Sequence, residues 1–219
     1  MAQKKLKITN DKFQIKNKRS MKDIYVVVAN PNLKESISYK IGVEALRRIK
    51  KQKKNIEIKI INLYDFKVPF YKTFSKGVYK ISKDQKVRLP KDLQKIVNEM
   101  RSYKIYVFIY PIWWSNMPAI LKNFFDWSVF FGMKYDFKGS KEPLHKNKRA
   151  FLITACGADD YSQEEKERMI ELIKLNILPW WGIKKIDSLL IDGTYNISEK
   201  RIKKYTKECQ GKLFKVMKF

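Results

Sequence analysis

Two adjacent tryptophans, Trp113 and Trp114, are the residues of this sequence that best suit a flat aromatic ligand. They follow the apolar run 105–110 and Pro111, and two polar residues come next. Proline lacks the N–H group that a sheet ladder needs, so Pro111 should end a buried strand. In open α/β sheets ligands bind beyond the carboxyl ends of the strands, where these rings would lie. The alternative is that both tryptophans belong to the core.

Two serines, Ser36 and Ser38, have the chemistry to bind a phosphate group. The apolar run 24–29 has the composition of a strand covered on both faces, and Asn30 follows it. Ser36 then stands where it would cap a helix with apolar residues at helical spacing. The unpaired N–H groups of a helix N-terminus, with two hydroxyls beside them, suit a phosphate. An ordinary N-cap without a ligand explains the same residues.

The other apolar segments continue an alternation of strands and helices. We expect further strands at 55–63, 149–155 and 188–191, and helices at 90–100, 118–131, 163–178 and from 198 onward. Such alternation is typical of a parallel sheet with helices on both faces. The segment 64–89 is long for a connection and is interpreted as a loop over a pocket or a partner surface.

A flavodoxin-like α/β fold suits these elements: a doubly wound, five-stranded parallel sheet of order 2-1-3-4-5. No glycine-rich dinucleotide motif follows the first strand, and no Walker A motif occurs. In the order 2-1-3-4-5 the first and third strands are neighbours, so the loops after Ala29 and Tyr110 meet at the switch point. The phosphate site and the aromatic site then become two parts of one ligand site.

Composition excludes several classes of site. The chain has 219 residues, of which 44% are hydrophobic, and this suits one globular domain. Cys156 and Cys209 are too few for a disulfide framework and lack metal-ligand spacing. With His145 as its single histidine, the chain offers neither a structural zinc site nor a Ser-His-Asp triad, and we expect no metal.

The chain has a formal net charge of +26, to which each end contributes +6: residues 1–20 carry six lysines and one arginine against one aspartate, and residues 201–219 carry seven basic residues against Glu208. We interpret 1–20 as a basic extension and 21–219 as the folded domain. Lysine outnumbers arginine, which disfavours nucleic-acid reading and leaves contact with an anionic membrane or membrane protein open. The chain shows neither a 20-residue apolar span nor a secretory signal, so we expect a cytoplasmic protein.

Four stretches resemble the flavodoxin-like NAD(P)H:quinone oxidoreductase family, which includes mammalian quinone reductases and ancillary proteins of bacterial potassium-efflux systems. They are ANPNLKESIS at 29–38, NLYDF at 62–66, YPIWWSNMPAILKNFFDW at 110–127 with FFGMKYDF at 130–137, and LITACGADDY at 152–161. The third stretch is the most specific, and the resemblance covers roughly residues 22–219.

This resemblance implies a homodimeric flavoprotein with FMN or FAD that passes electrons from NAD(P)H to quinones or similar acceptors in a ping-pong mechanism. The implied flavin-binding residues are Asn30, Ser36, Ile37, Ser38, Pro111, Ile112, Trp113, Trp114, Thr154, Ala155, Cys156, Gly157 and Tyr161. The implied substrate-binding residues are Trp114, Gly132, Tyr135 and Phe137, with Tyr135 as the catalytic hydrogen-bond donor to the acceptor. The apolar helix 118–131 is expected at the dimer interface.

The sequence departs from the family pattern in the flavin-binding loops. Asn30 stands where the family usually has histidine, the asparagine expected shortly after the serine is missing, and Cys156 replaces a glycine. These departures leave the choice between FMN and FAD open. Cys156 is expected to be a small side chain packed beside the flavin rather than a redox thiol. A competing function is a flavin-binding electron carrier or regulatory subunit that docks on another protein.

Overall fold

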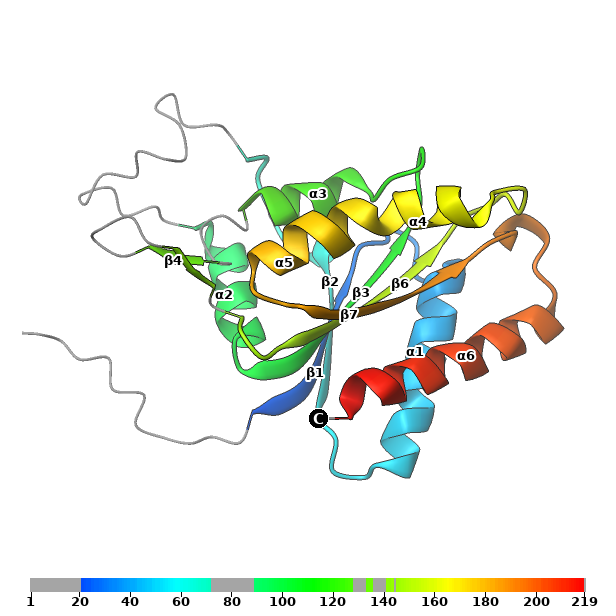
Figure 1. Ribbon diagram of the computed structural model, residues 1–219, viewed down its shortest axis with the longest axis horizontal. Helices are drawn as coiled ribbons and strands as arrows, with labels where there is room; N and C mark the ends of the chain where they lie inside the picture. Colours follow the sequence, from blue (N-terminus) through cyan, green and yellow to red (C-terminus); the bar gives the residue numbers. More distant parts are fainter. Residues whose placement is uncertain (1–20, 72–88, 128–132, 136–140, 144, 219) are drawn as a thin grey trace, which may run out of the picture.

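Five parallel strands form one sheet in the order β2-β1-β3-β6-β7, which is the order that the sequence predicts (Figure 1). The computed structural model describes residues 21–71, 89–127, 133–135, 141–143 and 145–218. The strands of the sheet are β1 (Lys22–Val28), β2 (Ile58–Asn62), β3 (Tyr103–Pro111), β6 (Arg149–Ala155) and β7 (Lys185–Ile191). The predicted fold class is therefore confirmed.

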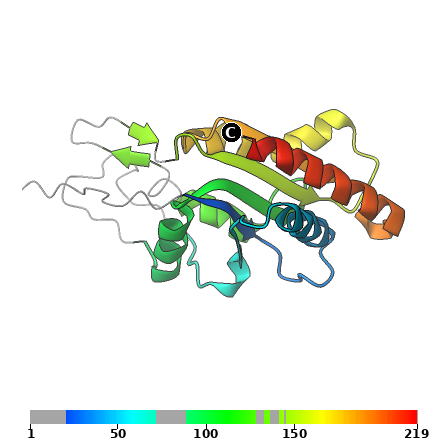
Figure 2. The ribbon, with the colours of Figure 1, turned by 90° about the horizontal axis from the view of Figure 1, so that it is seen from below.

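The three central strands, β1, β3 and β6, consist almost wholly of buried residues, because helices cover both faces of the sheet. On one face α1 (Ile37–Gln52) and α6 (Glu199–Met217) pack side by side (Figure 2). Gly42 allows close contact, since a Cβ at this position would lie 2.8 Å from the Ile109 side chain. The close approach fixes the start of α1 relative to β3.

The other face is covered by the helices between β2 and β7, which pack on a second set of buried residues (Figure 1). They are the turn η1 (Leu63–Asp65), α2 (Lys91–Met100), α3 (Ala119–Asp126), α4 (Gln163–Glu171), the π-helical η4 (Leu172–Ile177) and α5 (Leu178–Trp180). A last turn, η5 (Thr194–Asn196), leads from β7 to α6. No helix in the described part of the chain is long and apolar enough to cross a membrane.

Two features differ from the sequence prediction. The helix predicted at 118–131 is described as α3, which ends at Asp126, and residues 128–131 lie outside the described residues. A short antiparallel hairpin of β4 (Met133–Tyr135) and β5 (Lys141–Pro143) was not predicted, because three-residue strands are too short to show a period. Gly132, Phe137, residues 1–20 and most of the loop 64–89 lie outside the described residues.

Candidate functional site at the carboxyl edge of the sheet

Hydrogen bonds between neighbouring strand ends bring the predicted site loops together. The Ala29 N–H donates to the Ile109 carbonyl at 2.8 Å, which sets the loop after β1 beside the end of β3. The Ile112 N–H donates to the Ala155 carbonyl at 2.7 Å, which joins the loop after β3 to the loop after β6. The two half-sites predicted separately from the sequence therefore share one edge of the sheet.

The N-terminus of α1 is capped by Ser36, as predicted. Its Oγ accepts from the Tyr39 N–H at 3.2 Å and lies 3.2 Å from the Ser38 Oγ, and both serines are buried. The N–H groups of Ile37 and Ser38 precede the first intrahelical hydrogen bond of the helix. The first turn contains no acidic residue. The N-cap interpretation of Ser36 is confirmed, and the two backbone donors that remain have a geometry that suits an anion.

Asn30 shapes the loop that enters α1. Its side-chain oxygen accepts from the Asn32 N–H at 2.9 Å, and its carbonyl accepts from the Asn62 Nδ2 at 2.9 Å. Asn62 ends β2, so the loop after β1 is fixed from the neighbouring strand. The amide side chain of Asn30 therefore holds the backbone in a turn.

The tryptophans lie in a tight hairpin turn and outside the core. The Trp113 N–H donates to the Asn116 carbonyl at 2.8 Å, and the Asn116 N–H donates to the Trp113 carbonyl at 3.0 Å. The two residues between them, Trp114 and Ser115, have φ values of 50° and 57°. Positive φ at both central positions is the geometry of a type I′ turn. Trp113 is 44% exposed and Trp114 fully exposed, which excludes the core interpretation.

Such a turn is unfavourable for these residue types. Left-handed backbone costs about 1 kcal/mol or more at a residue other than glycine, and Trp114 and Ser115 both adopt it. A fully exposed indole adds unburied apolar surface. Strain of this kind clusters at ligand sites, and the position of the turn beside the start of α1 and the β6 loop fits a role in ligand binding.

The loop after β6 is held by the loop after β7. The Thr194 Oγ1 donates to the Cys156 carbonyl at 2.9 Å, and the Gly193 N–H donates to the Ala158 carbonyl at 2.9 Å. A Cβ at Gly157 would lie 2.3 Å from the exposed Tyr195 ring, so a larger residue here would displace that ring. The backbone of 156–158 is therefore tied to the loop after β7, and Gly157 places no side chain at its centre.

Cys156 is buried, and burial raises the pKa of its thiol. A thiol with a raised pKa is protonated at neutral pH and is a poor nucleophile. This environment agrees with a small side chain packed beneath the loop, as expected from the sequence.

Two buried hydroxyls lie directly below the site loops. Tyr110 and Thr154 are register partners on β3 and β6, and neither hydroxyl has a hydrogen-bond partner among the described residues. Both residues are fully buried, and burial raises the pKa of Tyr110. A buried hydroxyl without a partner costs about 1–3 kcal/mol. A polar ligand bound at this edge would explain why these two hydroxyls have no partner within the described residues.

Sequence reasoning missed a charged cluster around Asp192, directly after β7. Its carboxylate accepts from the Lys166 Nζ at 2.5 Å, from Arg201 at 2.9 Å and from the Tyr205 hydroxyl at 2.7 Å. Burial alone would raise the pKa of Asp192, but the hydrogen bonds from Lys166 and Tyr205 outweigh it and lower the pKa. The cluster ties α4 and α6 to the loop that supports 156–158. An Asp-Gly pair after a predicted strand was the available signal.

Residues 22–213 of the chain match the sequence model of a protein family described as having a flavodoxin-like fold. The chain belongs to this family. An FMN-dependent NADH:quinone oxidoreductase of Clostridium botulinum is 26% identical over 207 residues, which are 86% of this chain and 94% of that protein. A protein of the same description from Metamycoplasma arthritidis is 28% identical over 181 residues, 80% of this chain and 87% of that protein.

Among solved structures, an FMN-dependent NADH-azoreductase of Bacillus anthracis in complex with FMN superposes with a TM-score of 0.69. The two chains are 20% identical, and the match covers 90% of this chain and 100% of the other. An identity this low shows a common fold only. The resemblance to the flavodoxin-like oxidoreductases that the sequence suggested is confirmed by the family match and the relatives.

The structure does not bring Tyr135 to these loops. Tyr135 ends β4, and the partner strand β5 ends at Pro143, just before the amino end of β6. The site loops follow the carboxyl end of β6, roughly 20 Å away at about 3.3 Å per residue. Figures 1 and 2 both show the hairpin at the end of the molecule opposite the loops after β6 and β7. Tyr161, in contrast, lies at the site edge, just before the capping Ser162 of α4.

The described residues contain no group of three or more histidine, cysteine or acidic side chains placed to hold a metal ion. His145 is buried at the amino end of β6, where its Nδ1 lies 2.9 Å from the Tyr106 hydroxyl. It is therefore remote from the site loops.

Proposed function

We propose that the protein is an FMN-dependent NAD(P)H oxidoreductase that reduces quinones or similar acceptors. The observation that carries the proposal is the meeting of a phosphate-type helix N-terminus at Ser36 with a strained, exposed Trp113–Trp114 turn on one edge of the sheet. Relatives named FMN-dependent NADH:quinone oxidoreductases, matched over about nine-tenths of their length, support the choice of FMN over FAD and of NADH as the reductant.

The residues of the site fit FMN. The N–H groups of Ile37 and Ser38 and the two serine hydroxyls would bind its phosphate. The ring system would lie between the 111–114 loop and the 154–157 loop, whose backbone N–H groups can meet polar ring atoms. The buried hydroxyls of Tyr110 and Thr154 lack partners, and Gly157 leaves the loop surface without a side chain. When bound, FMN would supply the electron transfer between nicotinamide and acceptor.

The protein itself contributes orientation and the exclusion of water. Trp113 and Trp114 would form an aromatic wall against which reduced nicotinamide and then the acceptor stack in turn. A protonated Cys156 adds no competing nucleophile at this position. A shared pocket for both substrates requires that the first product leave before the second substrate enters, which is a ping-pong mechanism.

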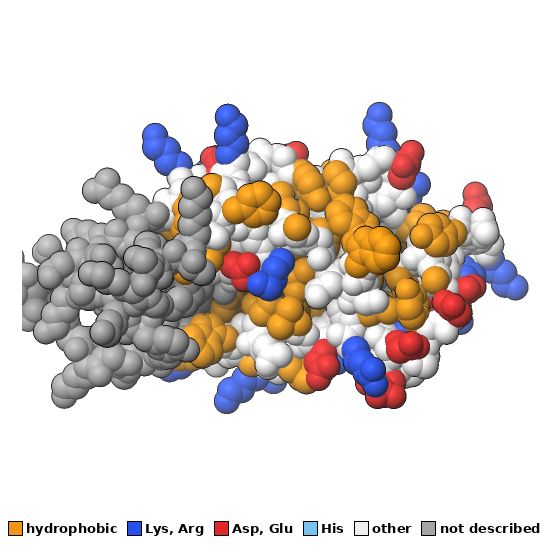
Figure 3. Space-filling view, turned by 90° about the horizontal axis from the view of Figure 1, so that it is seen from above, with side chains coloured by type: hydrophobic (Ala, Val, Ile, Leu, Met, Phe, Trp, Pro, Cys, Tyr) orange, Lys and Arg blue, Asp and Glu red, His pale blue; other side chains and the backbone are white. Residues whose placement is uncertain are grey.

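We also propose a homodimer whose interface includes α3, although three apolar side chains of α3 already pack within the protomer. The apolar residues Leu121, Phe124 and Phe125 of α3 are buried within the protomer, where Phe125 packs on Trp181 with ring centroids 5.6 Å apart. Hydrophobic side chains nevertheless gather on the face that carries α3 and α4 (Figure 3). The apolar residues of α3, of its C-cap and of η4 that are not fully buried are Ala119, Ile120, Trp127, Leu172, Leu175 and Ile177.

A second copy on this face would bury that surface. It would also allow the hairpin with Tyr135 of one protomer to reach the site of the other, which one protomer alone does not permit. Tyr135, Gly132 and Phe137 keep their proposed roles in acceptor binding on this basis. Light scattering at micromolar concentration tests the dimer, and a monomer would contradict it.

Steady-state kinetics and cofactor analysis test the proposed function. The purified protein should release FMN on denaturation, and its oxidation of NADH should depend on added quinone. Bound flavin without quinone-dependent turnover would favour the electron-carrier alternative. The cytoplasmic location stays a prediction, which cell fractionation would test.

A further inference from the structure

The amino edge of the sheet, opposite the site loops, carries a concave basic surface. A cavity of about 590 Å³ is lined by Lys146, Arg149, Lys184 and Lys185, among other residues. A second cavity of about 370 Å³ shares Arg149, Lys184 and Lys185 with it and adds Lys215. Because the two cavities share residues, they form one surface, here called the amino-edge surface.

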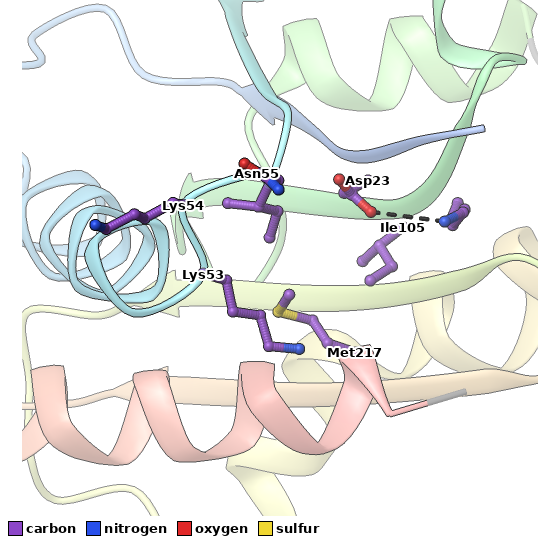
Figure 4. A pocket seen from close by; sticks show the side chains of 8 residues that line it. Asp23, Lys53, Lys54, Asn55, Ile105 and Met217 are labelled. Carbon is purple, nitrogen blue, oxygen red and sulfur yellow. Dashed lines mark ion pairs between the residues drawn. The ribbon is translucent and has the colours of Figure 1, made fainter. Parts of the chain in front are cut away.

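The amino-edge surface continues around the end of α6. A third cavity of about 380 Å³ is lined by Lys53, Lys54, Lys104 and Met217 (Figure 4). Met217 is the last residue of α6 and follows Val216, which lines the second cavity. In Figure 4 the side chain of Lys53 extends from the loop after α1 toward Met217. The lysines therefore spread along the whole edge and do not gather in one groove.

Some of these cations have structural roles. Lys148 donates to the carbonyls of Arg101 and Tyr103 beyond the end of α2, and Arg149 donates to those of Val216 and Lys218 at the end of α6. Such contacts satisfy helix C-termini, where cations are favourable. Helix stabilisation alone explains these two residues.

Other lysines on the same surface have no such role. Lys54, Lys184, Lys185 and Lys215 are exposed, and in the described part of the chain none of them pairs with a carboxylate. The nearby carboxylates are already matched. Asp23 lies 3.6 Å from Lys104, and Asp187 lies 3.9 Å from Lys212. The surface consequently keeps a net positive charge that the fold itself does not use.

We propose that the amino-edge surface docks on an anionic phospholipid membrane. Free lysine ammonium groups spread over an edge suit the diffuse charge of lipid headgroups. Nucleic-acid reading favours arginine forks, and the guanidinium of Arg149 is already bound to carbonyls. Two apolar side chains are also exposed at this edge, Met21 by 43% and Trp180 by 39%. Tryptophan and lysine are common at membrane interfaces.

The test compares two triple variants of the full chain that lose equal charge. Lys184, Lys185 and Lys215 are replaced by Gln in one variant, and the exposed α6 residues Lys200, Lys203 and Lys207 in the control. Residues 1–20 stay unchanged in both. Binding is measured by co-sedimentation with vesicles of phosphatidylcholine and phosphatidylserine, about three to one, at about 0.1 M salt.

The first variant should bind these vesicles about 100-fold more weakly than the wild type, while the control changes little. Circular dichroism should show both variants folded. If the two variants lose vesicle affinity equally, binding depends only on the total charge of the protein and the proposal is overturned. Wild-type protein that fails to bind the anionic vesicles would also overturn it. If instead the same variant loses duplex-DNA binding that is tighter than vesicle binding, the surface is a nucleic-acid site and the proposal is wrong.

Discussion

Substitution of Ser36 by Asp separates the helix cap from the phosphate site. Aspartate is as good an N-cap as serine, so the hydrogen bond to the Tyr39 N–H can be kept and α1 should remain stable. The new carboxylate, however, would lie next to a phosphate bound at the N–H groups of Ile37 and Ser38. At an assumed separation of about 5 Å and an effective dielectric constant of roughly 20–80, one pair of like charges repels by about 1–3 kcal/mol.

FMN affinity should therefore fall about 10- to 100-fold in Ser36→Asp, measured by quenching of flavin fluorescence as the flavin-free protein is added. Ser36→Asn is the matched control, because it keeps the cap and the size of the side chain without the charge. Raising the salt concentration should reduce the difference between the two variants. If Asp and Asn variants bind FMN equally, the phosphate does not lie at α1 and the proposed site is misplaced.

Three further substitutions, at Thr154, Lys148 and Tyr135, test a buried hydroxyl, a buried ammonium group and the acceptor pocket. Thr154→Val should stabilise the flavin-free protein by about 1 kcal/mol in urea denaturation, because it removes a buried hydroxyl without a partner; a loss of stability would reveal a missing partner. Burial lowers the pKa of Lys148 from 10.5 to about 8. As the pH rises, Lys148 releases its proton at a lower pH in the folded state than in the unfolded state. The free energy of unfolding should therefore rise between pH 8 and 10.5, and by pH 9.5 it should have gained about 2 kcal/mol compared with the pH profile of a Lys148→Met variant. Parallel pH profiles of the two proteins would contradict this. Tyr135→Phe should slow the oxidative half-reaction about tenfold in stopped-flow experiments and leave the reductive half nearly unchanged, and equal effects on both halves would make Tyr135 only a wall of the pocket.

The strands and helix starts were predictable because local residue types decide them. The runs 24–29 and 105–110 are buried on both sides, and such runs carry no alternation. Ser36 and Ser198 cap their helices in the structure as their positions predict. The strand order places β1 beside β3, so the sequence also predicted that the loops after these two strands meet.

Other features depend on contacts between distant parts of the chain. Trp181 fills the space beside Phe124 and Phe125, and no pattern within α3 reveals a partner more than fifty residues away. The type I′ turn at Trp114 was also hidden, since neither tryptophan nor serine favours positive φ. That geometry is imposed by the two hydrogen bonds between Trp113 and Asn116.

Anaerobic reduction by NADH is the decisive test of the proposed oxidoreductase function. NADH added to the FMN-loaded protein in the absence of oxygen should bleach the flavin absorption band in proportion to the NADH supplied. A quinone added afterwards should restore the band, and the Ser36→Asp variant should show the same cycle only at higher FMN concentration. A flavin band that NADH leaves unchanged, in protein shown to contain bound FMN, would contradict the proposed oxidoreductase function.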